Sequence, residues 1–205
     1  MKKPIIITLI SILVLSLVGL VYYLVLLSFS DDDQGPLKEI PGWYYRLEQS
    51  ATPLMIEEFS NLKEILTAEE VDYDAYAKAL SRLFVADLYT LSNKVNKYDV
   101  TSAQFLLPSF KDNFILNVQN TLYRFLEDNT SGNRTQALPE VNSITTINLE
   151  IIEFEIDEEM FEAYQITLNW TFIEDMGYDT EAIIILIRED KFLRIVEKRS
   201  IELES

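Results

Sequence analysis

The chain has 205 residues and a net charge of −17, and it contains neither cysteine nor histidine. This length suits one globular domain with accessory segments, and an apolar share of 48% is enough to build a packed core. Without cysteine there is no disulfide, thiol nucleophile or thiolate metal site. Without histidine the commonest general base and metal ligand is missing. We therefore expect a protein that is not an enzyme and that holds no cofactor and no metal.

Residues 5–29 form an uncharged run in which almost all side chains are apolar. A helix needs about 20 apolar residues to cross a bilayer, whereas the core of a signal peptide has roughly 7–15 and ends at a small-residue cleavage site. The run predicts an uncleaved single-pass anchor, with a cleaved signal as the alternative. Because Lys2 and Lys3 precede it, we expect residues 1–4 to form a cytoplasmic tip and the chain after the anchor to lie outside.

The next segment, residues 30–43, contains two prolines, two glycines and an acidic run. This composition predicts a linker, followed by an extracytoplasmic domain over residues 44–205. Without Lys2 and Lys3, 15 basic residues face 34 acidic ones, a net charge of −19. This negative charge disfavours binding of nucleic acid and of anionic lipid headgroups, and it favours a partner with a basic surface. Solubility of an outward-facing domain is the plainer interpretation.

Three helices are expected in the first half of this domain. A capping hydroxyl followed by Pro53 predicts a helix over residues 53–66. Residues 67–70 resemble a capping box, and apolar residues at helical spacing over 73–91 predict the second helix. A third stripe predicts a helix from 108 to about 128.

Four strands are expected in the second half, where the apolar period falls from 3.6 to 2. Residues 147–156 alternate, but the phase changes at 151–152, which is typical of a β-bulge that bends a sheet. Residues 164–172 alternate without interruption, 181–188 read as a central strand buried on both faces, and 192–199 return as the last strand. The predicted fold class is α+β, with about three helices packed on a curved four-stranded antiparallel sheet.

This layout resembles the cone-shaped nuclear-transport-factor-like superfold. With a short tip and one anchor in front, it also resembles bitopic assembly components of type IV secretion and conjugation machines, the family of the eighth VirB component, and membrane proteins associated with Mce systems. The resemblance is carried by the anchor at 5–29, the stripe at 73–91, the expected bulge at 151–152 and the strand Tyr164–Phe172. It implies a cone-like domain held at a bacterial membrane.

The function that we expect from these features is a membrane-anchored extracytoplasmic scaffold or assembly factor of a bacterial envelope complex, such as a secretion or conjugation machine. One alternative is a binder of small apolar ligands, or a lyase or isomerase, that uses the cavity of the cone. Another is an extracellular sensor or immunity protein. The expected partners are the lipid bilayer, envelope proteins with basic surfaces and a second copy of the chain, but not nucleic acid.

Asp87 is the sharpest candidate for chemistry because it continues the apolar stripe of the second helix. A carboxylate in such a desolvated place suits a general base. The alternative is a structural carboxylate at the edge of the stripe, or one paired with Arg82, Lys94 or a backbone N–H group. Three aromatic residues are candidates for a ligand or partner pocket, with packing in the core as the alternative: Tyr123, Tyr164 and Trp170.

Acidic residues gather between the first two expected strands, at Glu153, Glu155 and 157–159. Carboxylates are ligands that calcium prefers, but their spacing does not follow the pattern of a calcium-binding loop. A solvated run of charge that protects a sheet edge is the other interpretation, and we favour it.

Overall fold

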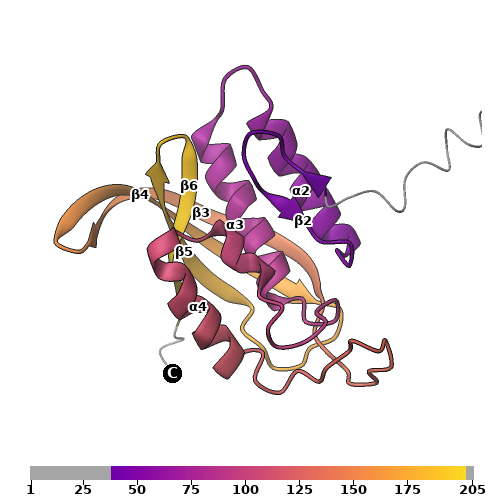
Figure 1. The fold of residues 1–205 in the computed structure, drawn as a ribbon. Helices are drawn as coiled ribbons and strands as arrows, with labels where there is room; N and C mark the ends of the chain where they lie inside the picture. Colours follow the sequence, from indigo (N-terminus) through magenta and orange to yellow (C-terminus); the bar gives the residue numbers. More distant parts are fainter. Residues whose placement is uncertain (1–37, 202–205) are drawn as a thin grey trace, which may run out of the picture. The chain divides into compact units, whose positions relative to one another are not determined.

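A computed structural model describes residues 38–201 of the chain (Figure 1). In this part the α+β class is confirmed, with three α-helices and a four-stranded antiparallel sheet. The elements follow in the order β1 (Lys38–Glu39), β2 (Arg46–Leu47), α2 (Pro53–Leu66), α3 (Tyr73–Tyr89), the 3₁₀ helix η1 (Thr101–Phe105), α4 (Pro108–Asn120), β3 (Val141–Ile156), β4 (Glu159–Phe172), β5 (Glu181–Glu189) and β6 (Phe192–Ser200).

The predicted cytoplasmic tip at 1–4 and the predicted anchor at 5–29 lie outside the described residues. Between residues 38 and 201, none of the helices combines the length and the apolar character that crossing a membrane requires.

The sheet has the order β3-β4-β5-β6, and each strand is antiparallel to the next. The predicted meander is therefore confirmed, because hairpin connections join strands that are neighbours in the chain. β5 has buried residues on both of its faces, among them Ile184 and Ile185, as its continuous apolar run predicted. β4 pairs with β5 only from Ala163 to Asn169, so the start of β4 pairs with β3 alone.

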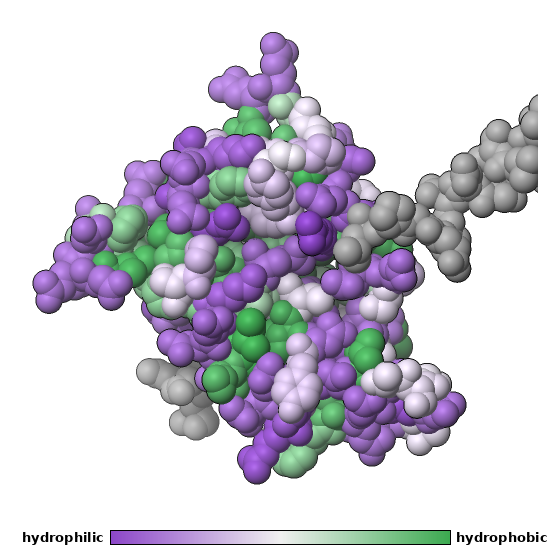
Figure 2. Space-filling view, viewed as in Figure 1, coloured by the Kyte–Doolittle hydropathy of each residue, from purple (hydrophilic) through white to green (hydrophobic). Residues whose placement is uncertain are grey.

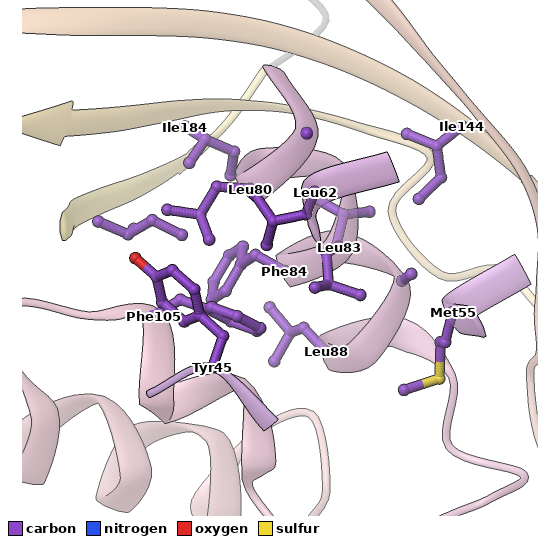
Figure 3. Packing of buried hydrophobic residues seen from close by; sticks show 14 of the residues in the cluster. Tyr45, Met55, Leu62, Leu80, Leu83, Phe84, Leu88, Phe105, Ile144 and Ile184 are labelled. Carbon is purple, nitrogen blue, oxygen red and sulfur yellow. The ribbon is translucent and has the colours of Figure 1, made fainter. Parts of the chain in front are cut away.

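Helix α3 lies at the centre of the core and buries side chains around most of its circumference. It contacts α2 on one side, η1 on another and the sheet on a third, which explains why its apolar stripe is so wide. Figure 3 shows the packing of this core, in which α3 residues meet residues of α2, of the sheet and of the N-terminal loop: Leu80, Leu83, Phe84, Leu88, Leu62, Ile144, Ile184 and Tyr45.

The folded unit starts before residue 44, where composition had placed the end of the linker. It begins at Glu39, and Ile40 and Trp43 are both buried in the core. The indole nitrogen of Trp43 donates to the carbonyl oxygen of Leu66 at 3.1 Å. The second half of the predicted linker is therefore part of the domain, because its few apolar residues pack on α2 and α3.

Helix α2 has the predicted bounds, and the Thr52 hydroxyl accepts a bond from the backbone N–H of Met55 at 3.5 Å. The expected capping box at 67–70 is wrong. Thr67 follows the last residue of α2 as its C-cap, and Asp72 caps α3 instead, since its carboxylate accepts from two backbone N–H groups at 3.0 Å.

Helix α4 ends at Asn120, eight residues before the predicted end. The side chains of Asn120 and Thr121 bond back to carbonyl oxygens of the preceding turn, which weakens the helix at this point. Tyr123 then turns inward and donates to the carbonyl oxygen of Leu88 at 2.9 Å. Phe125, expected on the apolar stripe, is 78% exposed as a result.

The predicted bulge at 151–152 is also wrong, because both residues pair continuously with β4. The irregularity nearest to it lies between Thr146 and Asn148. The change of phase at 151–152 has another cause. Ile144 and Leu149 pack toward the helices, whereas Ile152 and the apolar residues after it belong to a cluster on the opposite face of the sheet.

Candidate functional site

A pocket of about 530 Å³ lies between α3, α4 and β6. This volume falls in the range of small-molecule sites, roughly 300–1,000 Å³. Its wall is mostly apolar and comes from all three elements, with Phe84 and Leu88 on α3, Phe114 and Val118 on α4, and Ile195 on β6. The arrangement can hold an apolar group away from water.

One side of this pocket is polar. Asn113 and Asn117 on α4 and Thr121, the C-cap of this helix, are spaced four residues apart and all line the pocket, as expected for a single row on a helix. Asp179 also lines the pocket, and it accepts hydrogen bonds from the hydroxyl of Tyr89 at 3.1 Å and from the Lys198 ammonium at 3.2 Å. A ligand that combines an apolar body with polar groups fits this lining.

Tyr89 and Asp179 at this pocket each keep a single protonation state near neutral pH. Burial, together with the neighbouring Asp179 carboxylate, raises the pKa of Tyr89 well above its usual value. Partial burial acts to raise the pKa of Asp179, but Lys198 and the hydroxyls of Tyr89 and Ser200 outweigh it and leave this pKa below its usual value. Near neutral pH Tyr89 is therefore neutral and Asp179 is ionised, so neither group is set up to exchange protons as a general acid or base.

Asp87 is buried and does not line this pocket. Its carboxylate forms an ion pair with Lys94, one of the partners expected from the sequence, and also accepts from the Thr101 hydroxyl at 2.7 Å. The chain turns back after α3, so that the Lys94 side chain reaches Asp87 on this helix. In this arrangement Asp87 links α3 to the following loop.

The three aromatic candidates occupy separate places in the core. Tyr123 is fully buried, with its hydroxyl on α3, and Trp170 packs against Tyr89 near the end of α3, with the two rings tilted and their centroids 4.8 Å apart. Tyr164 lies six residues before Trp170 on β4, a separation of about 20 Å along a strand. None of the three candidates lines the pocket between α3, α4 and β6.

The first two strands of the sheet and most of the third carry acidic residues but no basic ones, a pattern that motif-by-motif inspection of the sequence does not bring out. From residue 135 to residue 187 the chain has no lysine or arginine. The same stretch, which holds β3, β4 and most of β5, has twelve acidic residues: Glu140, Glu150, Glu153, Glu155, Asp157, Glu158, Glu159, Glu162, Glu174, Asp175, Asp179 and Glu181. A count of charge by strand would have found it.

Half of these acidic residues lie in the distal hairpin, by which we mean residues 151–164 of β3 and β4. Beyond Ala163 and Tyr164, which still pair with β5, this hairpin extends past the sheet and past the helices, at the left of Figure 1. Figure 2 shows hydrophilic residues at its tip and apolar residues at its base. One face carries the exposed carboxylates of Glu153, Glu155 and Glu162, and the other carries half-buried apolar residues: Ile152, Phe154, Ile156 and Phe161.

The carboxylates of the distal hairpin have no cationic partner within residues 38–201, where the salt bridges involve other acidic groups. Two arginines near its base are already engaged. Arg188 stacks over the Tyr73 ring at 3.9 Å, and Arg194 pairs with Glu189 at 3.2 Å. The hairpin therefore presents uncompensated negative charge.

The calcium alternative finds no site in the part of the chain that the structure describes, since no three acidic side chains there converge to hold an ion. Comparisons with protein-family models, with curated proteins and with solved structures found no match.

Proposed function

We propose that the protein is a docking module tethered to the cell membrane, an extracytoplasmic scaffold or assembly factor that holds a basic partner protein in a bacterial envelope complex. The observation that carries this proposal is the distal hairpin, whose six acidic residues have no cationic partner among the described residues. A surface of one sign steers a partner of the opposite sign and disfavours other partners.

The tether belongs to the same proposal. The uncharged run at 5–29 would span the bilayer, and Lys2 and Lys3 would keep the N-terminus in the cytoplasm. The helices packed on an antiparallel sheet agree with the cone-like domain of the bitopic assembly components that the layout resembles, and the curvature of that cone is part of the proposal.

Site-specific photo-crosslinking tests the docking role in membranes of cells that produce the full chain. A photoreactive residue at Glu158, at the tip of the hairpin, should yield an adduct with an envelope protein. The same residue at the exposed Glu64 of α2 is the control and should not yield it. Charge reversal by Glu153→Lys with Glu155→Lys should remove the adduct at Glu158. An adduct that survives charge reversal would contradict the proposal.

The absence of cysteine gives a direct test of the tether. In intact cells, a membrane-impermeant maleimide should label Ser131→Cys, which lies in an exposed loop. It should label Lys3→Cys only after the membrane is permeabilised. The opposite labelling pattern would rule this orientation out. Release of the labelled chain from the membrane by salt would rule out an anchor that spans the bilayer.

A second function, binding of a small ligand with an apolar body, is favoured by the pocket between α3, α4 and β6. Its apolar wall beside the row of Asn113, Asn117 and Thr121 supports this reading. The two functions use different surfaces, because no residue of the distal hairpin lines the pocket.

A further inference from the structure

β3 is an edge strand of the sheet, and half of the backbone groups of its distal part point away from β4. The hairpin turn has two residues, since Ile156 pairs with Glu159. The pair next to a two-residue turn exchanges both of its hydrogen bonds, and such pairs alternate with pairs that exchange none. Counting back from the turn, Glu155, Glu153, Ile151 and Leu149 therefore direct their N–H and C=O groups outward.

One contact shows where this open edge starts. The backbone N–H of Leu149 donates to the side-chain oxygen of Asn148 at 2.9 Å. This N–H therefore does not bond to β4, as the alternation counted from the turn predicts. Beyond it, no backbone group of another described segment bonds to the outer side of Ile151, Glu153 or Glu155. An edge of this length with free backbone groups is a template for an added strand.

The side chains along the edge specify what kind of strand fits. Ile151, Glu153 and Glu155 lie on one face of the hairpin, and Ile152, Phe154 and Ile156 on the other, where they are half-buried. Residues of an added strand lie directly beside residues on the same face. Basic side chains therefore fit beside Glu153 and Glu155, and apolar side chains fit beside Phe154 and its neighbours.

Two other occupants fit this edge less well. A second copy of the chain would bring Glu153 and Glu155 beside the same carboxylates, and like charges directly opposite each other destabilise a pair of strands. The chain's own residues 1–37 contain only Lys2 and Lys3 as basic residues, and the acidic run Asp31–Asp33 follows the apolar segment. Neither offers alternating basic and apolar residues.

We infer that the distal edge of β3, from Ile151 to Glu155, binds an extended segment of a partner protein in which basic and apolar residues alternate. The segment adds as a fifth strand, bonded to the outward backbone groups, with its basic side chains beside the two glutamates. This inference rests on the proposed docking function and names the mode of docking and the chemistry of the partner.

The test uses the full chain in nanodiscs of zwitterionic phosphatidylcholine, which does not attract a basic peptide by charge. The probe is a fluorescent octapeptide that alternates lysine and valine, and the readout is fluorescence anisotropy. The expected result is saturable binding at least tenfold tighter than that of a control octapeptide with four lysines followed by four valines. Equal binding of the two peptides would overturn the alternating pattern.

A pair of variants separates backbone pairing from charge. Glu153→Thr and Glu153→Pro remove the same charge, but only proline removes the outward N–H, and it leaves the bonds to β4 intact. We expect about threefold weaker binding for the threonine variant and about tenfold further weakening for the proline variant. Equal affinity of the two variants would overturn strand addition.

Methylated peptides give the same answer without altering the protein. In an antiparallel addition the lysine residues exchange hydrogen bonds with Glu153 and its neighbours, and in a parallel addition the valine residues do. Methylating the amide nitrogens of one residue type should therefore abolish binding, and methylating the other should leave it. If both peptides bind like the parent, strand addition fails while docking stands. If binding survives Glu153→Lys with Glu155→Lys, the docking function itself fails.

Discussion

Asp87 and Lys94 form an ion pair inside the core, with 4% and 2% of their side-chain surfaces exposed. The Thr101 hydroxyl accepts a bond from the Lys94 ammonium and donates one to the Asp87 carboxylate, each at 2.7 Å. Three segments meet at this point, the end of α3, the loop after it and η1. The ion pair with Lys94 is one of the structural arrangements of Asp87 that the sequence left open, beside its role as a candidate general base.

Removing one partner of this pair should destabilise the fold strongly. Lys94→Met leaves the Asp87 charge buried without compensation, at a cost of about 3–5 kcal/mol. Adding Asp87→Leu should recover part of that loss. Thermal unfolding of the detergent-solubilised chain measures both effects. Arg46→Met, which breaks the exposed pair with Glu39, is the control and should cost less than about 1 kcal/mol. Similar losses for Lys94→Met and Arg46→Met would contradict this account.

Stability should fall at alkaline pH because buried tyrosines resist ionisation. Burial raises the pKa of Tyr76 from 10.0 to about 12, and it raises the pKa of Tyr45 and of Tyr123 as well. The unfolded chain loses these protons first, so stability is fully present below pH 10 and falls as pH rises toward 12, by about 1.4 kcal/mol per pH unit for each group.

Urea unfolding at a series of pH values measures this dependence. Tyr76→Phe should make the fall between pH 10 and 12 shallower by one proton, since phenylalanine does not ionise. An unchanged slope in that variant would show that other groups cause the alkaline loss.

The turn of the distal hairpin should tolerate glycine better than its natural residue. Asp157 and Glu158 have φ values of 50° and 68°, in the left-handed region that disfavours residues with a Cβ. Glu158→Gly should stabilise the fold by about 0.5–1 kcal/mol. Glu158→Ala removes the same charge but keeps the Cβ, so its melting temperature should stay below that of the glycine variant. Equal temperatures would attribute the effect to charge alone.

The pocket between α3, α4 and β6 should take up small amphiphiles. Methyl NMR of the full chain in nanodiscs can follow Ile195 and Val196, which line it, during titration with pentan-1-ol. Asn113→Trp should suppress the shifts by filling the pocket. Asp112→Trp, on the same helix but outside the lining, should leave them. Equal responses of the two variants would place the alcohol elsewhere.

Local patterns determined much of the fold. The start of α2 follows from Thr52 and Pro53, whose effects on the backbone are contained within one helical turn. The alternation of β4 and the continuous apolar run of β5 reflect burial on one face and on two faces. These features were predictable because each is set by neighbours in sequence.

Other features required the tertiary structure, because they depend on residues distant in sequence. Helix α4 ends early where Tyr123 reaches the carbonyl oxygen of Leu88. The phase change at 151–152 marks the place where β3 passes beyond the helices and buries its other face, rather than a bulge. The sequence shows only that the phase changes, since both causes leave the same pattern of letters.

The same distinction applies to the opening composition. The chain by itself determined an excess of acidic residues, the lack of histidine and cysteine, and an uncharged run at 5–29. Only the tertiary structure decided where the excess negative charge lies and that part of it lines an unpaired strand edge. Pairing of β3 with β4 places the carboxylates of Glu153 and Glu155 along an unpaired backbone edge. The pleat of a strand sends alternate side chains to one face, and an edge strand keeps one side of its backbone free to bond.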